Sequence, residues 1–288
     1  MRRAAAALFA LIALGLGEPA WAKPPVWIVR DADSELVLFG SVHILPAGMD
    51  WRPPALTRAL AAADDVWFEL PIDPATEAET SRLATQLGVL PRDQSLFHRL
   101  APTDAERLGR VAKAYGADAA MLDRLRPWLA EVALGAAAYR KAGAGEAAGV
   151  EQAIAAAAPA SAQRRAFETP REQIELIAGT SEAEQIDSLR GTLEEMEREP
   201  DQFARLVREW MSGDIKALDR DALEPLRKAS PQLFRRIVTD RNARWTRVLD
   251  QRLKGHGRTV VVVGMGHVIG PDGVPARLRA LGYRVQGP

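Results

Sequence analysis

The sequence contains no cysteine among its 288 residues. This absence excludes disulfide bonds, thiolate-ligated zinc, iron–sulfur clusters and a cysteine nucleophile. Histidine is scarce, since the only copies are His43, His98, His256 and His267. Any histidine chemistry must therefore use some of these four residues.

The sequence also has no excess of charge of either sign, because Lys+Arg and Asp+Glu number 38 each. A dedicated nucleic-acid-binding protein usually shows a basic excess, so we expect no nucleic-acid partner. Hydrophobic residues make up 47% and charged residues 26%, which are ordinary globular values and argue against intrinsic disorder. The length suits one large domain or two small ones.

Long hydrophobic runs are missing beyond the N-terminus. Arg2 and Arg3 precede the uncharged apolar segment Ala4–Gly17, and Ala20-Trp21-Ala22 then matches a signal peptidase site. We interpret residues 1–22 as a cleaved signal peptide rather than an uncleaved anchor, because the apolar run is short for a membrane span. The mature chain is then expected in the periplasm or secreted, with no membrane span.

Short β-rich segments lie near both ends of the chain, and helical patterns fill most of the middle. The strongest segment, Thr259–Val263, is apolar at nearly every position, which predicts a strand buried on both faces. We expect an α/β fold whose central mixed, largely parallel sheet is built from N- and C-terminal strands, with a long helical middle section packed over it. Residues 23–288 would form a single domain with a helical insertion at about 74–255. The expected strands are Val26–Arg30, Glu35–Phe39, Asp65–Leu70, Gln163–Glu168, Thr259–Val263 and Tyr283–Val285.

Polar side chains follow four of these strands. His43 ends a Gly-x-x-His segment after one strand, His267 comes just after another, and Glu69 and Glu168 stand at the ends of two more. Ligands bind outside the carboxyl ends of strands in open α/β sheets. We therefore expect the four side chains to meet at one edge of the sheet, although a lone strand-end histidine or carboxylate is often only structural.

Other motifs give weaker evidence of function. Gly264 to Gly270 resembles a dinucleotide-binding turn, but no second strand and acidic residue follow, so we expect no nucleotide. His98 and His256 lack the strand-end setting and receive no role. Ser41 fits a local hydrogen bond better than a nucleophile, because His43 follows it by only two residues.

The chain resembles the TraB/GumN family, which is related to the Tiki metalloproteases and more distantly to erythromycin esterases and ChaN-like proteins. The resemblance covers nearly all of residues 23–288. Glu151 stands where the family commonly has Asp, and Asp240 where it commonly has Glu; both keep the charge. The resemblance is carried by the segments Gly40–His43, Glu69, Asp93–Leu100, Arg126–Leu129, Gly149–Glu151, Phe167–Ile177, Trp210–Asp214, Asp240–Asn242 and Val261–Val285.

The resemblance implies an α/β core whose two halves each bring a Gly-x-x-His to one cleft. It implies metal-dependent peptide hydrolysis for the Tiki branch, with Mn or Co favoured, and a histidine general base for the esterase branch. The site that it transfers to this chain is His43, Glu69 and His267, supported by Glu168 and Arg241.

These residues predict a hydrolase. His43, Glu69 and His267 are a mixed N/O ligand set that suits a divalent ion, Mn or Co, with Zn or Fe not excluded. Such an ion activates water; without it, one histidine could activate water while Glu69 orients it. Arg241 could stabilise an oxyanion or be a solvated helix charge. Glu168 could be a ligand, a partner of a ligand or a strand-end charge.

The expected function is therefore an exported, metal-dependent hydrolase that cleaves peptide or ester bonds of a peptide or small-molecule substrate held in a cleft. The alternative is a non-catalytic periplasmic protein of the envelope that binds a metal, haem or a partner through the same cleft. The sequence does not settle the oligomeric state.

Overall fold

The computed structural model describes residues 23–46, 48–145 and 149–288; the predicted signal peptide lies outside them. The strands are β1 (Val26–Arg30), β2 (Ser34–Ser41), β3 (Leu45–Pro46), β4 (Asp65–Phe68), β5 (Ala144–Gly145), β6 (Gln163–Ala166), β7 (Gly257–Gly264) and β8 (Val285–Gln286). The helices are α1 (Pro54–Ala61), α2 (Pro74–Gly88), η1 (Phe97–Arg99), α3 (Pro102–Tyr115), α4 (Ala119–Leu122), α5 (Pro127–Lys141), α6 (Val150–Ala157), α7 (Pro170–Ala178), α8 (Glu182–Arg198), α9 (Gln202–Ser212), α10 (Ile215–Leu218), η3 (Asp219–Leu223), α11 (Glu224–Ala229), α12 (Pro231–Phe234), η4 (Arg235–Thr239), α13 (Asp240–Leu253), η5 (Met265–His267) and α14 (Val274–Ala280).

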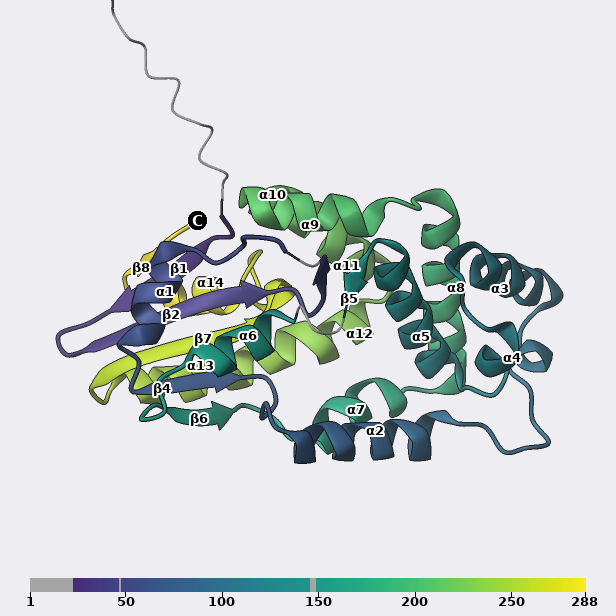
Figure 1. Ribbon diagram of the computed structural model, residues 1–288, viewed down its shortest axis with the longest axis horizontal. Helices are drawn as coiled ribbons and strands as arrows, with labels where there is room; N and C mark the ends of the chain where they lie inside the picture. The colour runs from purple at the N-terminus through teal and green to yellow at the C-terminus, as the bar shows by residue number, and fades with distance from the viewer. Residues whose placement is uncertain (1–22, 47, 146–148) are drawn as a thin grey trace, which may run out of the picture.

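The main sheet of the described residues has six strands in the order β6-β4-β7-β2-β1-β8. β6, β4, β7 and β2 are parallel to one another, and β1 is antiparallel to both β2 and β8. The central strand β7 is the apolar Thr259–Val263 segment, and Val260–Val263 are all buried, as its composition predicts. The carboxyl ends of the parallel strands point toward the large helical part of the molecule (Figure 1).

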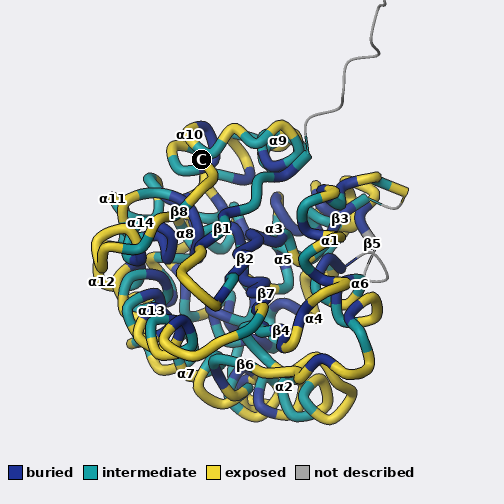
Figure 2. Tube along the Cα trace, turned by 90° about the vertical axis from the view of Figure 1, so that its left-hand side faces the viewer, coloured by how far each residue is buried: buried dark blue, intermediate teal, exposed yellow. Residues whose placement is uncertain are grey.

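Helices cover both faces of this sheet. α1 contacts β2, β7 and α6, whereas α13 contacts β2 and α14. Figure 2 shows the sheet between these two helical layers, with α1 and α6 on one side and α13 and α14 on the other. The apolar side chains between the layers form one hydrophobic cluster that contains all four valines of Val260–Val263.

A second hydrophobic cluster lies beyond the carboxyl edge of the sheet. It is formed mainly by α3, α5 and α8, with Leu108, Leu134 and Leu193 among its fully buried members. Pro127 occupies the start of α5 and separates it from α4, because proline lacks the N–H that a helix interior needs. This helical part faces the edge of the sheet at which the predicted site lies (Figure 1).

The predicted fold class is confirmed: the chain forms a mixed, mostly parallel sheet with a long helical section. β1 and β2 form an antiparallel hairpin, and the Asp73 side chain caps α2. One detail differs, because β6 comes from the middle section yet pairs with β4 as an edge strand. Pro225 lies in the first turn of α11, where its missing N–H costs no helical hydrogen bond. Among the described residues, no helix combines the length and apolar character that a membrane span needs.

Trp210 of α9 attaches the helices to the sheet. It is fully buried, its ring packs against Phe39 and Trp51, and its Nε1 donates to the Gly40 carbonyl at 2.8 Å. The contact therefore joins a large apolar surface to a buried hydrogen bond at the end of β2.

We predict that Trp210→Ala lowers the free energy of unfolding by about 3–5 kcal/mol, because it leaves a cavity and an unpaired carbonyl. Val248→Ala, at a 40% exposed position of α13, is the control and should cost no more than about 0.5 kcal/mol. Urea denaturation measures both values. Equal losses in the two variants would contradict this role for Trp210.

Candidate functional site

The register of the sheet brings the predicted residues to one edge. Ser41 of β2 lies opposite Gly264 of β7, and Phe68 of β4 lies opposite both Val262 of β7 and Ala166 of β6. The strands thus end at nearly the same level. The residues that follow them, including His43, Glu69, Glu168 and His267, therefore leave the sheet at the same edge.

Gly264 marks the point at which three of these side chains converge. A Cβ atom at this position would lie 3.2 Å from Glu69 Oε1, 3.7 Å from His267 Cδ2 and 3.9 Å from His43 Nε2. The Gly264 N–H also donates to Glu69 Oε1 at 2.7 Å. The absence of a side chain at this strand exit is what lets the carboxylate and the two imidazoles approach the same backbone.

His43 is held by a carboxylate that comes from another element. Its Nδ1 lies 2.7 Å from Glu151 Oε1 of α6, and Ser41 Oγ donates to the same oxygen at 2.6 Å. The hydrogen bond to Glu151 raises the pKa of His43 to about 9, although partial desolvation acts in the opposite direction. The imidazole side chain remains 70% exposed. Because Nδ1 donates to Glu151, the lone pair of the neutral ring is on Nε2.

Glu69 is an ionised carboxylate with three hydrogen-bond donors. Besides Gly264, Gln173 of α7 donates to Oε2 at 3.1 Å and Arg241 of α13 donates to the same oxygen at 2.5 Å. Burial alone would raise the pKa of this carboxyl, but the positive charges of protonated His267, Arg241 and protonated His43 lower it to about 2. Glu69 thus carries a negative charge at neutral pH.

Every N–H group of the Arg241 guanidinium has a hydrogen-bond acceptor within the protein. Its Nε and one terminal nitrogen donate to Glu168 at 2.9 and 2.7 Å, and that terminal nitrogen also donates to Glu69. The other terminal nitrogen donates to the Ile237 carbonyl at 3.1 Å and lies 3.0 Å from His267 Nε2. An arginine side chain has five N–H donors, and these contacts account for all of them.

Glu168 is buried beneath Arg241 and does not reach the cleft. Its oxygens accept hydrogen bonds from Arg241, from Trp245 Nε1 at 3.1 Å and from Arg244 at 3.2 Å. A carboxylate with this many donors orients the arginine and the tryptophan around it. The structure therefore places Glu168 as a partner of Arg241, a contact that the sequence analysis did not predict.

His267 is buried, in contrast to His43. Its Nδ1 lies 2.6 Å from Asn242 Oδ1, and its ring packs at 4.5 Å from that of Trp245. Because the amide oxygen only accepts, Nδ1 carries the proton, and the lone pair of Nε2 faces Arg241. Burial lowers the pKa of His267 to about 4, so the ring is neutral at pH 7.

A cleft of about 380 Å³ opens beside these residues. His43, Glu69 and Glu151 form its polar side, together with Gln152 and Gln173. The apolar side consists of Phe68, Leu70 and Ile72. Arg241, Glu168 and His267 do not line it, so His43 and Glu69 are the two predicted site residues that a substrate in this cleft could touch.

Sequence reasoning did not assign roles to Glu151, Gln173, Asn242 and Trp245. The first two lie on helices that start just before them, with Gly149 preceding α6 and Thr169 capping α7. Asn242 and Trp245 follow Arg241 by one and four residues on α13, so that all three side chains reach the same region. The spacing Arg-Asn-x-x-Trp was the signal available for the last pair.

The fold and the site together define a class: an α/β protein in which the exits of parallel strands gather two histidines and two glutamates around one buried arginine. The chain belongs to the TraB/PrgY/gumN family, whose sequence profile matches residues 25–287. The family assignment made from the sequence is thereby confirmed. The comparisons with curated proteins and with solved structures give no match.

We predict that Glu168→Gln lowers the free energy of unfolding by about 3 kcal/mol, because it leaves Arg241 buried with one carboxylate fewer. Glu175→Gln is the matched control on α7, where the carboxylate forms only an exposed i,i+4 pair with Arg171 and should contribute under about 0.5 kcal/mol. Urea denaturation provides the comparison. If Glu168→Gln is no less stable than the control, Glu168 does not orient the arginine as described.

We predict that Glu151→Gln lowers the pKa of His43 from about 9 toward its ordinary value of 6.5. A raised folded-state pKa stabilises the protein fully below pH 6.5, and this contribution disappears as the pH rises through about 9. The variant should therefore lose stability mainly below pH 9. NMR titration of the imidazole resonances measures the pKa, with Glu77→Gln on α2 as the charge-matched control. An unchanged titration of His43 would rule out the Glu151 contact as the cause.

Proposed function

We propose that the protein is an exported hydrolase of peptide or ester bonds in which His43 acts as the general base. The observation that carries this proposal is the arrangement of His43: Nδ1 is fixed by Glu151 at 2.7 Å, and both Nε2 and the carboxylate of Glu69 approach Gly264 at the cleft. A carboxylate that fixes the tautomer and orientation of a histidine is a recurrent element of hydrolytic sites. The periplasmic or secreted setting of this proposal rests on the signal peptide predicted for residues 1–22.

In the proposed reaction, a water molecule binds between His43 Nε2 and Glu69. The neutral imidazole takes a proton from this water as it attacks the carbonyl carbon, and Glu151 stabilises the imidazolium that forms. Glu69 accepts a hydrogen bond from the water and orients it, because its charge persists at every pH above about 2. The imidazolium then returns the proton to the leaving group.

The pKa of His43 sets the pH dependence of this step. Because the group acts only as the neutral imidazole, the rate should rise with pH toward about 9 in the wild type. The carboxylate that raises this pKa is also the one that stabilises the charged intermediate. Removing Glu151 would therefore move the rising limb to lower pH and lower its plateau.

The predicted metal ligands are His43, Glu69 and His267, and their arrangement decides whether they can share one ion. Among the described residues, no group of three or more His, Asp and Glu side chains is arranged to hold a metal ion. The lone pair of His267 faces the guanidinium of Arg241 at 3.0 Å, which places a cation where a shared metal would bind. His43, Glu69 and His267 in this arrangement therefore do not fit a common ion, and the proposed reaction uses none. A requirement for Mn or Co remains a prediction, which rates measured with and without these ions test.

Arg241 is better suited to positioning than to oxyanion stabilisation, because all its N–H groups already have acceptors. It fixes Glu69 on the side away from the cleft and fixes Glu168 behind it. We propose that Arg241 and Glu168 act through Glu69, and that His267 acts through Arg241.

We predict that His43→Ala reduces hydrolysis of peptide or aryl ester substrates by at least ~10²-fold, the loss expected when a general base is removed. His98→Ala is the control, because His98 is an exposed residue of η1 away from the cleft. Initial rates are measured with EDTA, with added Mn²⁺ and with added Co²⁺, alongside thermal melts of both variants. Equal rates for His43→Ala and the wild type would overturn the catalytic role.

The assays with EDTA and with added metal ions distinguish a mechanism that uses the histidine alone from one that depends on a metal ion. Full activity in EDTA supports the histidine mechanism, whereas activity only with Mn²⁺ or Co²⁺ supports the metal-dependent one and requires Arg241 to leave His267. Absence of hydrolysis in all arms would favour the alternative, a non-catalytic envelope protein that binds a metal, haem or a partner through this cleft.

A further inference from the structure

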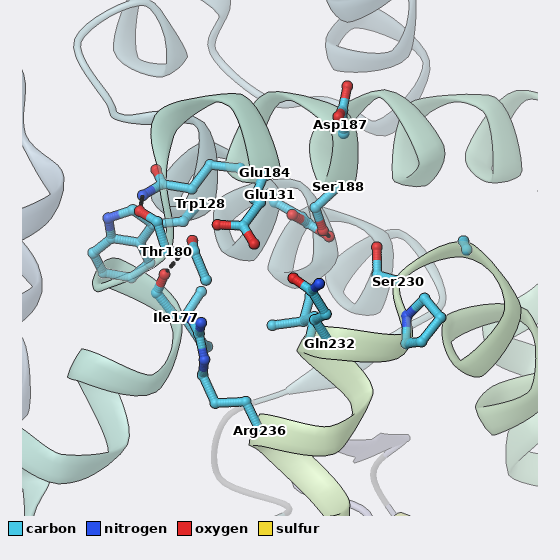
Figure 3. A pocket seen from close by; sticks show the side chains of 14 residues that line it. Trp128, Glu131, Ile177, Thr180, Glu184, Asp187, Ser188, Ser230, Gln232 and Arg236 are labelled. Carbon is cyan, nitrogen blue, oxygen red and sulfur yellow. Dashed lines mark hydrogen bonds between the residues drawn. The ribbon is translucent and has the colours of Figure 1, made fainter.

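A second cavity, of about 370 Å³, lies in the helical part of the molecule. It is enclosed by α5, α7 and α8, and by the segment from α11 through α12 to η4 (Figure 3). None of its lining residues lines the cleft of the candidate site. The volume falls in the range of roughly 300–1,000 Å³ that is typical of small-molecule sites.

One wall of this cavity carries a carboxylate without a basic partner. Glu131 of α5 accepts hydrogen bonds at Oε1 from Ser188 Oγ at 3.1 Å and Thr192 Oγ1 at 2.6 Å. Within the described chain it forms no ion pair, and no donor reaches Oε2. Burial raises the pKa of this carboxyl, and the two hydroxyl hydrogen bonds act against that shift. A cation at Oε2 would remove the cost of keeping the group ionised.

The opposite wall carries a guanidinium that forms no ion pair among the described residues, although its charge helps to lower the pKa of Glu184 of α8, which lines the same cavity. Arg236 of η4 has one hydrogen bond, a contact of 3.5 Å from a terminal nitrogen to the Leu176 carbonyl. In the described ranges, no carboxylate oxygen lies within 4.0 Å of its nitrogens. In Figure 3 its side chain extends toward the cavity from the side opposite Glu131. The planar guanidinium group suits bidentate recognition of a carboxylate or phosphate group.

Two more polar atoms in the cavity wall lack partners. Trp128 is 2% exposed and its Nε1 has no acceptor among the described residues, while Gln185 is 6% exposed and its Oε1 has no donor there. Both atoms are inaccessible to solvent, so they lie behind the cavity surface and do not themselves contact its contents. Ile177, Pro231 and Leu233 add apolar surface to the same cavity.

We propose that this cavity binds a small zwitterion of the α-amino acid type, with the ammonium group at Glu131 and the carboxylate group at Arg236. The two charged side chains do not pair with each other, so a ligand that bears both charges can neutralise both walls at once. A simple anion would leave Glu131 unpaired, and a simple amine would leave Arg236 unpaired. The apolar wall would contact the side chain of the ligand.

The test begins with saturation-transfer NMR on the full chain, with each of the twenty common L-amino acids at about 10 mM, a level that detects dissociation constants near 1 mM. The strongest binder is then titrated calorimetrically against its N-acetyl derivative, which lacks the ammonium charge, and its carboxamide, which lacks the carboxylate. Each lost charge should weaken binding at least ~10-fold, as expected for a charge-assisted hydrogen bond.

The variants Glu131→Gln and Arg236→Gln assign each charge to its wall. Glu131→Gln should weaken binding of the amino acid but not of its N-acetyl derivative, and Arg236→Gln should weaken binding of the amino acid but not of its carboxamide. Glu175→Gln is the control, because Glu175 lies outside the cavity lining and forms an exposed pair with Arg171 at 3.0 Å.

The proposal is overturned if no amino acid binds, if a singly charged analogue binds the wild type as tightly as the zwitterion, or if neither variant weakens binding. The comparison of analogues on the wild type remains decisive even if a variant fails to fold. Because the readout is binding, it is independent of the hydrolysis assay on the other cleft.

Discussion

The site depends on one buried guanidinium group. Arg241 joins α13 to the exits of β4 and β6 through Glu69 and Glu168, and it reaches His267 after β7. A buried cation is costly unless nearby charges and hydrogen bonds compensate for its lost hydration. Here two carboxylates lie against it, and the cation in turn makes it possible for both of them to stay ionised side by side. Neither the positions nor the charges of these side chains can be understood separately.

This arrangement divides two histidines with similar sequence settings into different roles. His267 is enclosed by Asn242, Trp245 and Arg241, and its pKa falls to about 4. His43 is exposed to the cleft and hydrogen-bonded to Glu151, and its pKa rises to about 9. The environment supplied by helices α6 and α13, rather than the Gly-x-x-His pattern itself, produces this difference. Truncating His267 would therefore disturb packing, whereas truncating His43 would change mainly the cleft.

Much of this organisation could be predicted from the sequence, because it depends on the strands. Thr259–Val263 is unmistakably a buried strand, and the rule that parallel strands end at one edge placed His43, Glu69, Glu168 and His267 together. The contributions of the helices could not be predicted in the same way. Glu151 reaches His43 across 108 residues, and no periodicity in α6 distinguishes it from a solvated first-turn carboxylate. A sequence pattern likewise does not show that all the N–H donors of Arg241 find acceptors inside the protein, because this depends on distances between side chains.

The position of β7 between β2 and β4 has a consequence for how the protein folds. Gly264 follows Glu69 by 195 residues, so β2 and β4 gain their shared central neighbour only when a distant segment of the chain reaches them. Until then, β2 and β4 each have an unpaired edge, which is prone to intermolecular pairing. Pairing of β7 with both strands is a non-local step and is expected to be slow. A chain without β7 lacks Gly264, and with it the backbone position at which Glu69 and the two histidines converge.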